Sequence, residues 1–350
     1  MAHLPGQNNA ESLEPPDLVA ALTDSPGLLA LSKERMSNSA EPRARSWRPW
    51  LIRGVKLLIL IVVAAGIQRT VFAAIEQLEQ HAWQWRPGWL ALSGLLYLVG
   101  VLPNAWFWFW TMHRLGTRPS FAKALVAYYV GHLGKYVPGK GMVVVLRAGL
   151  VRGPSVDTRL AAAAVFYETL TTMAVGGALA ALIMVGWLHV RWQIAGLSIV
   201  LALVVAVPTL PPIARRLIAR LRSRDNDLLT AADIPIHWST MGVGWISAMI
   251  GWIALGFSLE AALVASDAQI TNPVADLPLC IAAVGLAVVA GFLSFLPGGA
   301  VVREAVLLEL LVPRYGAAAA VVGAVMLRLA WLGAELITAL VIWLLSLRGS

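Results

Sequence analysis

Residues 131–152 read GHLGKYVPGKGMVVVLRAGLVR, and this stretch decides how the chain can fold. Three cations stand in it, among residues that are otherwise as apolar as lipid tails: Lys135, Lys140 and Arg147. Pro138 and Gly139 interrupt any helix that would carry these cations across a bilayer, because proline lacks a backbone N–H and glycine weakens helices. A broken helix at membrane depth persists only where protein or a water-filled cavity covers its free backbone groups. Since intramembrane cations are costly and usually functional, the stretch indicates a polar pathway for an anionic molecule.

A second break of the same kind lies in residues 295–304, which read FLPGGAVVRE. Its corner consists of Pro297, Gly298 and Gly299, and the charged residues Arg303 and Glu304 follow. Discontinuous helices that meet near the middle of the bilayer are typical of secondary transporters. The two breaks together therefore predict a membrane transporter.

The composition is that of a polytopic helical membrane protein. Of the 350 residues, 59% are hydrophobic and only 13% are charged, whereas soluble domains are about one quarter charged. The mean hydropathy is +0.73, and several apolar stretches reach the roughly 20 residues that cross hydrocarbon. The formal net charge of +8 is explained by arginines in cytoplasmic loops, so it does not indicate a nucleic-acid partner. Cys280 is the only cysteine, which excludes a disulfide framework and a Cys-based metal site.

About eight hydrophobic segments are expected, in an all-α polytopic membrane fold with about six full spans and two broken or re-entrant hairpins. The full spans are predicted at 54–75, 88–110, 160–187, 192–210, 239–265 and 316–346. The hairpins are predicted to join 121–137 to 141–151 and 277–296 to 300–312. The two pieces of the first hairpin are short for spans at about 1.5 Å per residue, and two short full spans are the alternative there.

The charges of the loops predict the orientation of these segments. Arginines and lysines precede the first span and follow residues 110, 151 and 210, whereas the loops after residues 75 and 265 are acidic. By the positive-inside rule, both termini lie in the cytoplasm and the two hairpins open to opposite sides. That arrangement is compatible with an inverted repeat. Residues 1–46, rich in Pro, Ser, Asn and Glu, are predicted to form a disordered cytoplasmic tail before the membrane domain, 47–350.

Four local features add expectations about packing and loops. The residues from Pro211 to Arg224 are expected to be an arginine-rich loop, and the aromatic run 106–110 a belt at headgroup level rather than an aromatic cage. The small residues of span 160–187 are suited to close helix packing: Ala161 to Ala164, Gly176 and Gly177. Glu260 lies near the outer end of its span and is expected to be structural.

The intramembrane charges define the candidate site. The predicted headgroup ligands are Lys135, Lys140, Arg147, Arg303 and Arg328. Glu168, Glu304 and Glu335 are predicted to balance these charges or to take protons during gating. Arg328 and Glu335 lie seven residues apart, so they project from one face of the last span. Buried ion pairs that only fix the register of the helices are the alternative explanation.

Several of these residues form runs that resemble a known family. The runs KYVPGK at 135–140, LPGG at 296–299 and Arg303-Glu304, with Arg147, Arg328 and Glu335, resemble the lysylphosphatidylglycerol synthase transmembrane-region family over roughly residues 50–346. Its members are flippase-like, so the resemblance implies movement of charged or glycosylated lipids between leaflets. The family's usual GGLGVRE run has Val301 here in place of its last glycine, which implies a stiffer or reshaped corner.

The resemblance implies a translocase without a synthase domain. Aminoacyl-lipid synthases carry a large cytosolic domain after the membrane region, whereas this chain ends four residues past the last predicted span, so we expect no synthase activity. We expect an inner-membrane lipid translocase for an anionic or modified phospholipid or a polyprenyl-linked lipid. Its expected partners are membrane lipids, together with lipid-modifying or glycosyltransferase enzymes.

Two other classes of protein are the alternatives. One is a membrane-embedded enzyme or accessory subunit of a lipid-linked glycan pathway, and the other is a structural membrane scaffold. The sequence contains no P-loop, nucleophile elbow, Rossmann fingerprint or spaced set of metal ligands. We therefore expect no catalytic residue, no cofactor and no metal site.

Overall fold

The computed structural model describes residues 86–136, 141–188, 192–222, 234–266, 268, 270, 272–294, 299 and 301–348. All regular elements in these ranges are helices, which confirms the all-α polytopic membrane class. The predicted tail and the first span, 54–75, lie outside the described residues, as do Pro138, Gly139, Lys140, Pro297 and Gly298.

Six described helices are long and apolar enough to cross a membrane. They are α4 (Pro87–Arg114), α7 (Thr158–Ile183), α8 (Trp192–Ala206), α10 (Trp238–Ala265), α11 (Pro273–Leu293) and α13 (Ala317–Arg348). A π-helical turn, η2 (Met184–Leu188), extends α7, and a 3₁₀ turn, η3 (Val207–Thr209), extends α8. Five of the six predicted full spans therefore appear as helices, and α11 adds the longer arm of the second predicted hairpin.

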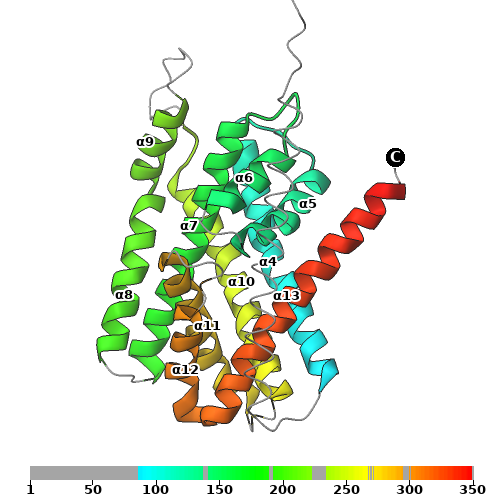
Figure 1. Cartoon of the computed structure of the whole chain (residues 1–350). Coiled ribbons are helices and arrows are strands. Elements are labelled where there is room, and N and C mark those ends of the chain that lie inside the picture. The colour runs from blue at the N-terminus through cyan, green and yellow to red at the C-terminus, as the bar shows by residue number, and fades with distance from the viewer. Residues whose placement is uncertain are drawn as a thin grey trace, which may run out of the picture. The chain divides into compact units, whose positions relative to one another are not determined.

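Both predicted breaks interrupt the helices where the Pro-Gly corners stand. On one side, α5 (Phe121–His132) tightens into the 3₁₀ turn η1 (Leu133–Tyr136), and α6 (Gly141–Leu150) follows after the corner. On the other side, α11 is followed after its corner by α12 (Val302–Tyr315). In Figure 1, α5 and α6 lie at the same end of the bundle as α9, and α12 lies at the opposite end. The two hairpins thus open toward opposite ends of the bundle.

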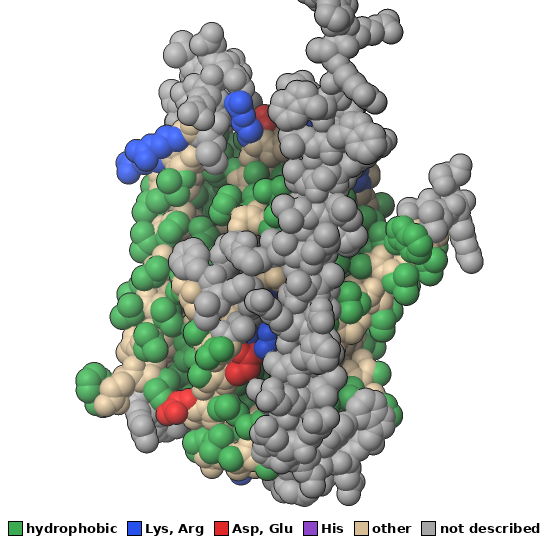
Figure 2. All heavy atoms as spheres, viewed as in Figure 1, with side chains coloured by type: hydrophobic (Ala, Val, Ile, Leu, Met, Phe, Trp, Pro, Cys, Tyr) green, Lys and Arg blue, Asp and Glu red, His purple; other side chains and the backbone are tan. Residues whose placement is uncertain are grey.

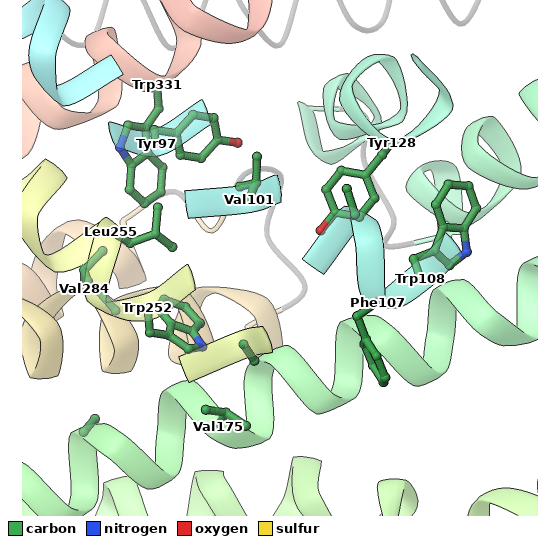
Figure 3. Close-up of a cluster of buried hydrophobic side chains, with 14 of the residues drawn as sticks. Tyr97, Val101, Phe107, Trp108, Tyr128, Val175, Trp252, Leu255, Val284 and Trp331 are labelled. Atoms are coloured by element: carbon green, nitrogen blue, oxygen red, sulfur yellow. The ribbon is translucent and has the colours of Figure 1, made fainter. Parts of the chain in front are cut away.

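Small residues set the closest helix contacts. Gly251 of α10 packs on Gly100 of α4, where an added Cβ would come within 2.7 Å of a carbonyl oxygen. The small-residue face of α7 is buried as predicted, with Ala162 as its partly exposed member. Close approach of helices through small residues is the usual way to pack spans, because lipid gives no hydrophobic drive between them. Large side chains such as Trp252 and Trp331 fill the remaining space (Figure 3).

Three local expectations were wrong. The arginine-rich segment is a helix, α9 (Pro211–Arg222), because prolines are tolerated in a first helical turn and Ala214 and Ile218 bury one face. Phe107 and Trp108 are fully buried against neighbouring spans, so the run 106–110 is not a simple interfacial belt. The second arm of the second hairpin was expected to end at residue 312, but α12 continues through Pro313 and stops before Gly316, whose φ is 79°.

The surface agrees with a membrane location. Hydrophobic side chains cover much of the visible flank in Figure 2, and Lys or Arg side chains gather near the end where α9 lies. The protein is a multi-pass membrane protein.

At the corner between α11 and α12, the backbone of Val301 adopts a conformation that is unfavourable for valine. Val301, directly before α12, has φ 70° and ψ −54°, whereas nearly all residues with a branched Cβ avoid positive φ. This is the position where the resembling family has glycine. The Val301 side chain is 73% exposed, so it gains little burial in return.

We expect Val301→Gly to stabilise the protein, by about 1–3 kcal/mol, because glycine adopts positive φ without strain. Thermal unfolding in detergent micelles would measure this as a higher midpoint temperature. Val302→Gly is the matched control, since residue 302 begins α12 and glycine inside a helix should lower the midpoint. Equal destabilisation by both changes would contradict the strain at residue 301.

Candidate functional site

A cavity inside the bundle brings together charges from both hairpins. It holds about 1360 Å³ of empty space, a volume that includes its open mouth, and it is lined by α4, η1, α5, α6, α7 and α10 to α13. Of the predicted ligands, Lys135, Arg147 and Arg303 line this cavity, together with the predicted balancing residue Glu168.

Arg147 and Glu168 form a buried ion pair on the α6 side of the cavity. Both side chains are 3% exposed, and Nη1 of Arg147 lies 2.8 Å from Oε2 of Glu168. Tyr128 donates to the other carboxylate oxygen at 2.9 Å, and its ring lies under the guanidinium at 3.7 Å. Glycine at position 131 of α5 leaves room for the Arg147 side chain, because a Cβ there would lie 2.4 Å from the arginine Cγ. The charge is thus neutralised by Glu168 and covered by the Tyr128 ring, although Nε of Arg147 is buried without a hydrogen-bond partner among the described residues.

Glu335 joins the first hairpin to α13. Lys135 binds its Oε1 at 2.5 Å, Tyr136 donates to its Oε2 at 3.1 Å, and Tyr97 of α4 also donates to Oε1. The Glu335 side chain is 1% exposed, whereas that of Lys135 is 27% exposed. One carboxylate therefore fixes a broken helix against two spans through donors that an incoming anion would also attract.

Arg328 and Glu304 form the third ion pair, between α13 and the first turn of α12. Their atoms Nη1 and Oε1 are 2.6 Å apart, and each side chain is 21% exposed. Glu304 also stands in the first turn of α12, where the helix dipole favours a negative charge.

Arg303 differs from the other described cations of the site. Its guanidinium lies over the ring of Trp331 at 4.4 Å, and Trp331 in turn stacks on Tyr97 at 4.6 Å (Figure 3). Among the described residues, no carboxylate is ion-paired with it, and its Nη2 is buried without a hydrogen-bond partner. A buried charged donor without a partner is costly, so this position favours an anion from outside the protein.

Much of the remaining cavity wall is apolar, although Asn104, Thr169 and Thr172 also line it. Phe166, Leu170 and Met173 of α7 face Val288 and Phe292 of α11 across it. Phe166 is 53% exposed, so this side reaches the lipid-facing surface of the bundle. Cationic and apolar walls in one cavity suit a molecule with an anionic head and an apolar chain.

The structure shows which of the predicted residues form ion pairs with one another, which the sequence left open. Arg147 pairs with Glu168, Lys135 with Glu335, and Arg328 with Glu304. The aromatic members were missed: Tyr97, Tyr128, Tyr136 and Trp331. Their signal was present, because tyrosine hydroxyls inside apolar segments need a partner when buried. Within the described ranges, no group of three His, Cys, Asp or Glu side chains is placed to hold a metal ion.

One comparison with known proteins identifies a family. The profile described as the lysylphosphatidylglycerol synthase TM region matches residues 52–346. No curated protein matches the chain.

Removing one partner of the Arg147–Glu168 pair should destabilise the fold more than removing both. Glu168→Gln leaves a buried guanidinium uncompensated, at a cost of about 3–5 kcal/mol, whereas the double change Arg147→Met/Glu168→Gln leaves no charge. Thermal unfolding of the wild type, both single variants and the double variant in micelles gives the coupling. Additive losses would show that the pair is not energetically linked.

Proposed function

The chain belongs to the lysylphosphatidylglycerol synthase TM region family, and we propose that it is a lipid translocase. It moves an anionic or modified phospholipid, or a polyprenyl-linked lipid, between the leaflets. The observation that carries this proposal is Arg303, a cation without a carboxylate partner among the described residues, in a cavity that also has an apolar wall.

The arrangement supports binding of a lipid phosphate at Arg303. A guanidinium donates two parallel hydrogen bonds to a phosphate, and here its face is already held by Trp331. Lys135, the more exposed member of its ion pair, lines the same cavity. The acyl or prenyl chain lies along Phe166 and Phe292, where the cavity wall is apolar.

The ion pairs supply the means of gating. Each joins a hairpin helix to a span: α6 to α7, η1 to α13, and α12 to α13. A phosphate that attracts Lys135 or Arg328 weakens the hold of Glu335 or Glu304 on the hairpins. Motion of a hairpin against a fixed frame is how alternating access operates in transporters with broken helices. This function needs no bond-breaking step, so we propose a transporter and not an enzyme.

We also propose that the protein lies in the inner membrane with both termini in the cytoplasm. The arginines of α9 then lie on the cytoplasmic side, as the positive-inside rule requires. The first hairpin opens to the same side, since α5, α6 and α9 share one end of the bundle (Figure 1).

Arg303→Ala should abolish translocation while the protein stays folded. A lost hydrogen bond to a charged group is worth about 1.5–3 kcal/mol, which corresponds to roughly ten- to hundredfold weaker headgroup binding. The measurement is leaflet exchange of labelled anionic, aminoacylated and polyprenyl-phosphate lipids in reconstituted vesicles. Arg303→Lys should retain part of the rate, because the charge remains but the fork of donors is lost.

Arg216→Ala is the matched control, because Arg216 is an exposed arginine of α9 away from the cavity. It should translocate lipid at the wild-type rate. Wild-type rates in Arg303→Ala, or no acceleration of any lipid class by the wild type, would refute the translocase.

The proposed orientation can be tested with a single introduced cysteine. Cys280 is fully buried, so it should not react with a membrane-impermeant maleimide. Arg216→Cys should be labelled in intact cells only after the inner membrane is permeabilised. Labelling from outside before permeabilisation would show that the orientation is the opposite of the proposed one.

A further inference from the structure

A second polar cluster lies outside the cavity, where α10 and α11 meet. It contains Glu260 of α10, which is 5% exposed, and Asp276 of α11, which is 4% exposed. Neither residue lines the cavity that contains Lys135, Arg147 and Arg303. A carboxyl group buried inside a membrane helix is costly when ionised and is a candidate for a functional role.

The packing register places Glu260 against Asp276. A Cβ on Gly256 would lie 3.3 Å from the backbone N and Cα of Ile281, so α10 and α11 touch at these residues. Consecutive helices joined by a short connection run antiparallel. Glu260 lies four residues further along α10, on the same face, and Asp276 lies five residues before Ile281, in the preceding turn of α11.

The two carboxyl groups have different partners. Arg314, at the end of α12, binds Asp276 at two points, with Nε 3.0 Å from Oδ1 and Nη2 3.4 Å from Oδ2. By contrast, Oε1 of Glu260 is buried and has no hydrogen-bond partner among the described residues. If Glu260 were ionised, this oxygen would have no hydrogen bond among the described residues to compensate for its lost hydration.

Among the described residues, no ion pair to Glu260 is formed by the other groups near it. Cys280 of α11 is fully buried, and the hydroxyl of Tyr315, which follows Arg314 in α12, is buried without a partner. From α4, Arg86 donates to the carbonyl of Val264, one turn beyond Glu260. The turns of α7 and α13 that pack at this end, 177–186 and 317–324, carry no titratable side chain.

We propose that Glu260 is a proton-binding site of this protein, separate from the headgroup cavity. In this proposal Glu260 is the protonated partner, while Asp276 binds Arg314. Loss of the proton places a second carboxylate beside Asp276, and the two then compete for Arg314.

The position of Arg314 connects this site to the headgroup cavity. Arg303 and Arg314 stand eleven residues apart on α12, which is about three turns, so they lie on nearly the same face of one rigid helix. A shift of Arg314 between two carboxylates therefore moves the helix that presents Arg303. This coupling rests on the proposed function, whereas proton binding at Glu260 does not.

Modification by a hydrophobic carbodiimide tests the proton site directly. The reagent adds to protonated carboxyl groups within membranes and leaves a mass label, and the ion-paired Glu168 and Glu335 are buried controls in the same molecule. We expect label on Glu260 at about pH 6 and at least about tenfold less at about pH 9, a range that spans the titration of buried carboxyls. Glu168 and Glu335 should stay unlabelled, and Glu260→Gln should remove the label.

Three outcomes would overturn the proposal. They are absence of label on Glu260 at the lower pH, equal label on all three glutamates, and protection of Glu260 by sodium ions at constant pH, which would indicate a metal cation instead. Circular dichroism of Glu260→Gln checks that its helices remain.

Lipid exchange under an imposed pH gradient tests the coupling. The wild-type rate should respond to the gradient, and Glu260→Gln should exchange lipid at a rate independent of it. An equal response in both proteins would refute the coupling. If the wild type moves no lipid, the translocase fails, and the labelling result still decides whether Glu260 binds a proton.

Discussion

The structure depends on one constraint: a charge inside a membrane protein needs a partner. Four ion pairs among the described residues meet this constraint: three join a hairpin element to a span, and Arg314–Asp276 joins the two arms of the second hairpin. Tyrosine side chains complete the environment of two of these pairs: Tyr128 contacts both Arg147 and Glu168, and Tyr97 and Tyr136 donate to Glu335. Arg303 meets the requirement only in part, through the ring of Trp331. Our proposal for headgroup binding rests on that exception.

The sequence predicted the helical class, the positions of the described spans and both breaks, because these follow from local composition. Long apolar runs and Pro-Gly corners act within one segment, so no tertiary knowledge is needed to find them. The amphipathic helix α9 was predicted as a loop because its two prolines were counted as breakers, although both stand in the first turn. Prolines in the interior of a helix would have broken it, so the error lay in the position assumed for these two prolines.

The candidate site was predicted as a set of residues but not as a set of contacts. Arg147 and Glu168 were each identified from charge, and their pairing depends on how α6 packs on α7, which no spacing in the sequence encodes. Tyr97 was missed because it is distant in sequence from Glu335 and Lys135, which it meets in space. Glu260 was expected to be structural, since its isolation from donors appears only when α10 is placed against α11. Contacts between distant segments are the part of the answer that one sequence does not contain.

The helix contacts made through glycine and the contacts made through ion pairs differ in how they respond to dissolved molecules. Helices α4 and α10 meet at Gly100 and Gly251, backbone against backbone, and no dissolved molecule competes for such a contact. The hairpins are attached through charges, for which any anion or proton is a competitor. We therefore expect the frame to be insensitive to dissolved ions, whereas the attachment of each hairpin should respond to the anions and protons that reach its charged groups.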